Sequence, residues 1–280
     1  MAYALEIQNL NYAYPDRTVA LQKVNLRIKK QKKTAIIGTN GSGKTTLIYH
    51  INGTIPAQEG SVKVLDLQVC KENIYEVRRA VGLLFDNPDN QLFSTTVYGD
   101  IAFGPRNLKL DQEEVDRRVH AALHRVGIAE LAGRPPYCLS LGQKKRAAIA
   151  GLLAMEPEVM ACDEPFSGLD PVVSRQFREI LDELKEQGTT LIYSTHDVDL
   201  AYSWADEVVV MKEGRVLECG TVDLMRDEKL MENACLPLPL LAELFKHSAY
   251  KPRTIEEAAQ LLPGQHDFLA AVRRSVANRE

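Results

Sequence analysis

The sequence has little of what marks a membrane-spanning, exported or nucleic-acid-binding protein. Its 280 residues contain no apolar run close to the ~18 residues that a membrane-spanning helix needs. The first residues, MAYALEIQNL, include the acidic Glu6 and lack the basic start and apolar stretch of a signal peptide. The formal net charge is −4, so no excess of lysine and arginine offers a surface to nucleic acid. We therefore expect a protein without a nucleic-acid partner.

Cysteine is scarce and scattered, at Cys70, Cys138, Cys162, Cys219 and Cys235. No C-x-x-C pair occurs among them, which excludes a disulfide framework and a zinc knuckle and fits a reducing cytosol. The chain does have enough apolar sequence for a core, because 45% of its residues are hydrophobic and 26% are charged. This length and balance are typical of one large α/β domain or two small ones.

Short apolar runs alternate with helical stretches, and this alternation predicts an α/β protein with a mostly parallel sheet covered by helices. Five near-continuous apolar runs are the candidate buried strands: Thr34–Ile37, Val81–Phe85, Val159–Cys162, Thr189–Thr195 and Val208–Met211. Three earlier segments alternate more and predict an antiparallel flank: Leu5–Leu10, Val24–Ile28 and Ser61–Val64.

Two helices follow from apolar periodicity and from end signals. One runs over Asp111–Val126, with Asp111 and Glu114 at the spacing of a capping box. The other runs over about Ser140–Met155 and stops before a proline.

The sheet pattern disappears near the end of the chain. Prolines separate short amphipathic pieces there, and Thr254 and Glu257, again at capping-box spacing, predict a helix through Leu262. We therefore expect a main domain over residues 3–225, a helical subdomain within it at about 86–156, and a C-terminal helical extension over 226–280.

A phosphate-binding loop follows the first of the apolar runs. The segment fits G-x-x-x-x-G-K-[ST] at every fixed position and consists of Gly38, Thr39, Asn40, Gly41, Ser42, Gly43, Lys44 and Thr45. It lies between a predicted strand and a predicted helix, Thr45–Ile51, which is the context that the motif needs. Its glycines let backbone N–H groups surround phosphates, and the helix N-terminus adds the positive end of a dipole. Lys44 adds a charge, the Thr45 hydroxyl suits Mg²⁺, and Thr46 completes the candidate nucleotide-binding set.

A pair of acids narrows the chemistry. The apolar run Val159–Cys162 ends in Asp163 and Glu164. Asp163 would hold Mg²⁺, and Glu164 could polarise the attacking water as a general base. The alternative is a strand followed by a charged turn, which Pro165 terminates.

The segment Leu139-Ser140-Leu141-Gly142-Gln143 opens a helix in an unusual way. Ser140 and Gln143 stand at capping-box spacing, so one interpretation is simply a well-capped helix. Gly142 argues for more, because glycine inside a first helical turn costs roughly 1 kcal/mol relative to alanine and a cap does not require it. Without a Cβ at that position, a phosphate could approach the helix end and accept a hydrogen bond from Ser140.

This ordered set of motifs resembles the ATP-binding cassette family, from Tyr3 to about Asp223. The set comprises the P-loop, L-S-x-G-Q, the Asp-Glu pair, Ser167-Gly168-Leu169-Asp170, and His196 within Ser194-Thr195-His196-Asp197. The resemblance implies that two cassettes pair head to tail, with each ATP between one P-loop and the partner's L-S-x-G-Q helix. Ser140, Gly142 and Gln143 would then serve the opposite subunit's nucleotide. The turn that ends at Asp170 would couple the two sites.

The resemblance assigns further roles at the carboxyl ends of the predicted parallel strands, where open α/β sheets bind ligands. His196 would contact the γ-phosphate or orient water. Tyr14 resembles the family's aromatic residue that stacks on adenine, with Tyr12 as the competing candidate. The chain departs from the family at Asp86, where a glutamine is usual. An aspartate oxygen there could still reach Mg²⁺, or it could slow hydrolysis by disturbing the attacking water.

The stretches Phe85–Phe93 and Asp100–Leu108 resemble the ATPases of energy-coupling-factor importers, and Gln91-Leu92-Phe93 is most similar to the cobalt and nickel branch. This resemblance implies an ATPase at the cytoplasmic face of the cell membrane that drives uptake of cobalt or nickel. Its partners would be a second ABC ATPase subunit, identical or paralogous, a transmembrane scaffold protein that docks near Gln91, and a substrate-specific membrane protein. The alternatives are vitamin uptake by the same machinery, a soluble ABC ATPase that acts on DNA or the ribosome, and a regulator that hydrolyses ATP poorly.

Overall fold

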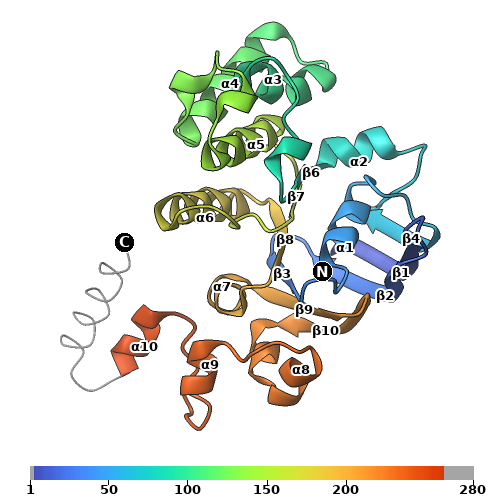
Figure 1. Cartoon of the computed structure of the whole chain (residues 1–280), viewed down its shortest axis with the longest axis vertical. Helices are drawn as coiled ribbons and strands as arrows, with labels where there is room; N and C mark the ends of the chain where they lie inside the picture. Colours follow the sequence, from blue (N-terminus) through green and yellow to red (C-terminus); the bar gives the residue numbers. More distant parts are fainter. Residues whose placement is uncertain (1–2, 262–280) are drawn as a thin grey trace.

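The computed structural model describes residues 3–261, which form two sheets and a set of helices (Figure 1). The larger sheet has the strand order β10-β9-β3-β8-β7-β6. Its strands are β3 (Lys33–Ile37), β6 (Val81–Leu84), β7 (Val159–Cys162), β8 (Thr190–Thr195), β9 (Glu207–Lys212) and β10 (Arg215–Thr221). All neighbours run parallel except β10, which pairs antiparallel with β9.

The five predicted parallel strands are confirmed to within one residue at each end. The edge strand β10 is not among the predictions, because its residues are only partly buried and show no clear apolar alternation. A tight hairpin places it beside β9, and both turn residues, Glu213 and Gly214, have positive φ angles of 47° and 75°. This is the conformation of the two-residue turns that match strand twist.

The antiparallel flank is also confirmed, as a second sheet of four strands in the order β2-β1-β4-β5. Its strands are β1 (Tyr3–Ala13), β2 (Val19–Lys29), β4 (Glu59–Val64) and β5 (Leu67–Gln68). The first two are longer than predicted, because register shifts along β1 interrupt the strict alternation on which the sequence interpretation depends.

Helices complete the described part of the chain. They are α1 (Lys44–Ile51), α2 (Ile74–Ala80), α3 (Val97–Asn107), α4 (Gln112–Arg125), α5 (Leu141–Met155), α6 (Pro171–Glu186), α7 (Val198–Trp204), α8 (Glu228–Asn233), α9 (Leu240–Leu244) and α10 (Ile255–Leu261). In Figure 1, α3, α4 and α5 pack together at one end of the molecule, and α8, α9 and α10 lie at the other. The predicted end of the last helix, Leu262, lies outside the described residues.

The two predicted capping boxes outside the L-S-x-G-Q segment form only in part. The Asp111 carboxylate accepts the Glu114 N–H, as expected at the start of α4. The Glu114 carboxylate, however, pairs with Arg117 and Arg118 instead of returning to the cap. At α10, Thr254 accepts the backbone N–H of the fourth residue of the predicted box in the same one-sided way. At α4 the arginine side chains thus outcompete a neutral backbone N–H for the Glu114 carboxylate, whereas at α10 the Glu257 carboxylate accepts the backbone N–H of Arg253, one residue before the cap.

Alternate residues of the parallel strands supply two hydrophobic cores. One core lies between the sheet and the insert formed by α3–α5, and also takes in α6 and α7. The other core lies between the opposite face of the sheet, α1 and the antiparallel sheet. Strand β7 shows the division, since Met160 and Cys162 belong to the first core and Val159 and Ala161 to the second. The fold class is therefore α/β with both faces of the parallel strands covered, as predicted.

The register of the parallel strands brings their carboxyl ends to one edge. Ile37 of β3 pairs with Thr195 of β8, and Leu84 of β6 pairs with Cys162 of β7. The residues that follow these strands therefore meet at this edge of the sheet.

Candidate functional site

The P-loop connects β3 to α1 and depends on glycine at two crowded positions. Gly43, which precedes α1, has φ +99°, and a Cβ there would lie 2.6 Å from the carbonyl oxygen of Ala20. A Cβ on Gly38 would lie 2.5 Å from Ser42 Oγ and 2.6 Å from the Met211 carbonyl oxygen. The loop therefore adopts this conformation only without side chains at those positions.

Two polar side chains of the loop fit a phosphate ligand. Lys44 is buried, and its Nζ donates to the carbonyl oxygens of Gly38 and Thr39 at 2.8 and 3.1 Å, so its charge lies over the loop. Burial lowers the pKa of Lys44, and the charges of two nearby acids partly offset this. Ser42 Oγ is buried and has no hydrogen-bond partner within residues 3–261. A buried hydroxyl without a partner is costly unless a ligand satisfies it.

Asp163 lies just beyond β7, and its carboxylate accepts hydrogen bonds from two neighbouring hydroxyl groups. Its Oδ1 accepts from Thr45 Oγ1 at 3.1 Å and from Ser194 Oγ at 2.6 Å. Burial raises the pKa of Asp163, whereas these two hydrogen bonds lower it. The carboxylate of Asp163 and the hydroxyl of Thr45 are hard oxygen donors of the kind that Mg²⁺ prefers. Two of the three residues predicted for the metal, Thr45 and Asp163, therefore lie together although they come from separate motifs.

Glu164 and His196, the two predicted catalytic residues, also face each other. Nδ1 of His196 lies 3.0 Å from Oε1 of Glu164. The Glu164 backbone has φ +43°, a left-handed conformation that costs on the order of 1 kcal/mol or more in a residue other than glycine. Its N–H donates to Ser194 Oγ at 2.9 Å, so Ser194 serves both acids. The sequence motifs assign no role to Ser194, although a buried serine near the end of an apolar strand indicates a polar partner.

Asp86 follows β6 and adds a carboxylate to the edge of the sheet that carries Asp163. Its carboxylate is exposed to 55% of its free area, and its charge contributes to raising the pKa of Asp163. Oδ1 of Asp86 lies 3.8 Å from Nζ of Lys145, a residue of α5 that motif reasoning missed. Lys145 is only 3% exposed, and a sequence signal exists, because it stands on the apolar side of α5.

The two tyrosines considered for the adenine differ in exposure. Tyr14 is exposed, and its hydroxyl lies 2.9 Å from Thr46 Oγ1 in the first turn of α1. Tyr12 is partly buried, and its ring packs edge-on against Tyr14 and His50. Of the two, Tyr14 has the ring that a base could reach.

The L-S-x-G-Q residues form a complete capping box at the start of α5. Ser140 Oγ accepts the Gln143 N–H, and Gln143 Oε1 accepts the Ser140 N–H. Both hydrogen bonds join Ser140 to Gln143, and neither involves the chain's own P-loop. A Cβ on Gly142 would meet nothing within 4 Å, so the fold itself does not require glycine here.

The turn from Ser167 to Asp170 contacts the same helix. Gly168 has φ +71°, and a Cβ on it would lie 3.1 Å from Leu141 Cδ2 at the start of α5. Asp170 caps α6 by accepting the Val173 N–H at 2.9 Å. The turn is therefore fixed between α5 and α6.

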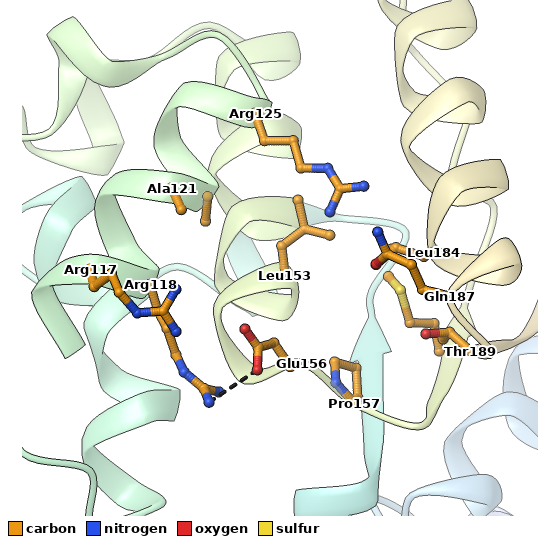
Figure 2. A pocket seen from close by; sticks show the side chains of 12 residues that line it. Arg117, Arg118, Ala121, Arg125, Leu153, Glu156, Pro157, Leu184, Gln187 and Thr189 are labelled. Atoms are coloured by element: carbon orange, nitrogen blue, oxygen red, sulfur yellow. Dashed lines mark ion pairs between the residues drawn. The ribbon is translucent and has the colours of Figure 1, made fainter. Parts of the chain in front are cut away.

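A separate cleft of about 350 Å³ lies between α4, the end of α5 and the end of α6 (Figure 2). It includes none of the predicted site residues. Its arginines are already paired, for example Arg118 with Glu156 at 3.0 Å and Arg125 with Glu183 at 2.5 Å. It therefore offers no free cation to a nucleotide, and the candidate site is the sheet edge.

A P-loop that lies beside a hydrogen-bonded Asp–Thr–Ser cluster and a Glu–His pair, on a two-sheet α/β fold, defines an ATP-hydrolysing cassette. A family model described as ABC transporter matches residues 21–167. The energy-coupling factor transporter ATP-binding protein EcfA of Carboxydothermus hydrogenoformans is 47% identical over 94% of this chain and 98% of its own length. The protein of the same name from Methanocaldococcus jannaschii is 45% identical over 87% of this chain and 88% of its own length.

Solved structures agree with these relatives. The cbiO1 protein of Clostridium perfringens, described as part of the ABC transporter complex cbiONQ, has a TM-score of 0.71 at 41% identity and covers 88% of this chain and all of its own. The ATP-binding cassette MJ0796, in a dimeric post-hydrolysis state with ADP and Pi, has a TM-score of 0.72 at 26% identity and covers 78% of this chain and 98% of its own.

The chain belongs to the ABC transporter ATP-binding proteins and, within them, to the energy-coupling-factor group. It is an ATPase subunit of such a transporter. None of the helices within residues 3–261 is long and apolar enough to cross a membrane.

Proposed function

We propose that this ATPase drives the uptake of cobalt or nickel from the cytoplasmic face of the cell membrane. The ATPase part of the proposal depends above all on one observation, the contact of Thr45 and Asp163 beside the Glu164–His196 pair. The cargo part is supported by Gln91-Leu92-Phe93 and by the likeness to cbiO1 of the cbiONQ complex. Vitamin uptake by the same machinery is the alternative cargo.

In the proposed site, the loop Gly38–Thr46 surrounds the phosphates of ATP, and Tyr14 stacks on the base. Thr45 and Asp163 would hold Mg²⁺, with Asp86 as a third oxygen donor. The bound ion would neutralise charge on the β- and γ-phosphates. Lys44 supplies a further positive charge to the same oxygens.

The chain's own residues account for the proton in hydrolysis. Glu164 accepts a proton from the water whose oxygen attacks the γ-phosphorus, while the bond from that phosphorus to the leaving ADP oxygen breaks. The products are ADP and inorganic phosphate. His196, at 3.0 Å from Glu164, orients the carboxylate and the water.

Two cassettes would complete each site. The open side of Gly142 and the exposed Ser140 suit a nucleotide bound to the partner's P-loop, because they contact nothing of their own loop. Gln143 holds the cap in place, and Asp170 fixes the turn that would connect the two sites. The partner is a second copy or a paralogue.

The membrane partners would be a scaffold protein and a substrate-specific protein. The scaffold would dock beside Gln91, whose side-chain amide donates to the Ala148 carbonyl oxygen at 3.1 Å. The exposed rings of Phe93 and Phe103, 4.8 Å apart, offer it an apolar contact. We further propose that residues 3–225 are the cassette, with 86–156 as its helical subdomain, and that 226–280 are a separate extension.

The catalytic assignment predicts that Glu164→Gln lowers the ATPase rate by at least ~100-fold, since a general base contributes about that much. ATP affinity should change little, because the glutamine keeps the shape of the side chain. Steady-state hydrolysis and binding of a fluorescent ATP analogue measure the two effects. A Glu164→Gln protein that hydrolyses ATP at the original rate would remove Glu164 from the mechanism.

The cargo assignment requires the complete transporter. Vesicles that contain the two membrane proteins, with this ATPase on the inner side, should accumulate radioactive cobalt or nickel only when ATP is also inside the vesicles. Uptake of a vitamin but of neither metal would establish the alternative cargo.

A further inference from the structure

Lys145 occupies a place in the protein where a charged side chain needs a reason. It is 3% exposed and lies in the second turn of α5, two residues after the capping box. A buried ammonium costs several kcal/mol unless hydrogen bonds and an opposite charge compensate it. The neighbouring Lys144, by contrast, reaches the surface and pairs with Asp89 at 2.7 Å.

The partners of Lys145 all belong to the catalytic edge. Its Nζ donates to the carbonyl oxygen of Glu164 at 3.2 Å and also to the carbonyl oxygen of Ser167. Asp86 provides the nearest carboxylate, at 3.8 Å. One side chain therefore ties α5 to both ends of the turn from Glu164 to Ser167 and to the end of β6.

That turn is strained at the residue that matters most for hydrolysis. Glu164 has φ +43°, and such a conformation persists only where surrounding contacts hold it. Ser194 holds the N–H of Glu164 from β8. Lys145 holds the carbonyl oxygen from the other side. The two contacts together fix the direction in which the Glu164 carboxylate leaves the backbone and meets His196.

We propose that Lys145 is a positioning residue for Glu164, which it holds in the hydrolytic conformation from the helix that begins at Ser140. This inference rests on the proposed role of Glu164 as general base. It adds a physical connection between the L-S-x-G-Q end of α5 and the general base of the same chain. A displacement of α5 would move the Glu164 carbonyl oxygen with it.

The test compares Lys145→Met with Lys144→Met, a matched change on the next residue of the same helix. In the purified full-length protein with Mg²⁺ and ATP, Lys145→Met should lower kcat at least ~10-fold and leave KM and the affinity for a fluorescent ATP analogue within about twofold. Lys144→Met should leave both within about twofold. An unchanged kcat in Lys145→Met, or a change confined to KM, would overturn the proposal.

A second comparison separates positioning from a general structural effect. In a Glu164→Gln background, adding Lys145→Met should reduce the residual rate by less than about twofold, because residues that act as a unit are not additive. Loss of the full single-variant factor in that background would also overturn the proposal. If Lys145→Met fails to give a folded protein by circular dichroism, Lys145→Gln replaces it. A folded Lys145→Gln protein with the original kcat would then decide against the role.

The same set of variants keeps the two proposals apart. If Glu164→Gln retains activity, the catalytic assignment itself fails. If Glu164→Gln is inactive and Lys145→Met is fully active, only the positioning role fails.

Discussion

At the scale of single residues, the contacts at the sheet edge show how few side chains carry the site. Ser194 connects Asp163 to the backbone of Glu164, and Lys145 reaches the same backbone from α5. Binding of the nucleotide base would depend on a single side chain. Of the two tyrosines considered, Tyr14 is exposed beside α1, whereas Tyr12 is partly buried.

Tyr14 allows a prediction that separates its ring from its hydroxyl. Tyr14→Ala should raise KM for ATP by about 10- to 100-fold, because stacking of a base on an aromatic ring contributes roughly 1–3 kcal/mol. Tyr14→Phe should keep KM within a fewfold, since it loses only the contact with Thr46. Steady-state hydrolysis measurements give KM for ATP, and for GTP as a second substrate, in each variant. The assignment moves to Tyr12 if Tyr12→Ala weakens ATP binding and Tyr14→Ala does not.

At the scale of secondary-structure elements, α5 combines two tasks. Under the proposed function, its first turn would present a capped end to a partner's nucleotide, and its second turn carries the lysine that reaches Glu164. Stability and function pull in opposite directions at Gly142. Glycine weakens the helix, but it leaves the space around the helix end open.

Gly142→Ala should therefore act with opposite signs on two measurements. A Cβ meets nothing within 4 Å, so the unfolding free energy should rise, by up to about 1 kcal/mol. The ATPase rate should fall, because the added methyl group stands where the partner's phosphate would approach. Chemical denaturation and steady-state hydrolysis give the two values, with Gly151→Ala, another open glycine of α5, as the control. A more stable protein with full activity would show that Gly142 does not face a phosphate.

At the scale of the whole molecule, the two cores bury both faces of the parallel strands. Cys162 reports on this directly, since it is fully buried at the end of β7 and burial raises its pKa to about 12. Cys138 and Cys235 are exposed.

Thiol labelling should follow this difference. At pH 8 the exposed Cys138 and Cys235 should react with a soluble disulfide reagent at the rate of free thiols, whereas Cys162 should react only as fast as the sheet opens. Adding denaturant should bring all cysteines to the same rate. Mass spectrometry of the labelled peptides identifies each thiol. Rapid labelling of Cys162 in the native protein would contradict the buried sheet.

The sequence by itself determined the parallel strands of the core and the motifs. The apolar runs gave the parallel strands to within one residue, because a strand covered on both faces must be apolar along its length. The P-loop and the Asp163–Glu164 pair were equally visible, because phosphate and magnesium chemistry demands particular residue types at fixed spacing.

Only the tertiary structure decided which of these residues meet and what holds them. The edge strand β10, the role of Ser194 and the reach of Lys145 to Glu164 depend on contacts between segments far apart in the chain. Spacing along the sequence carries no record of such contacts. Lys145 shows the physical reason. Its place on the apolar side of α5 indicates burial, but only the packing of α5 against the turn after β7 brings its ammonium to Glu164, Ser167 and Asp86.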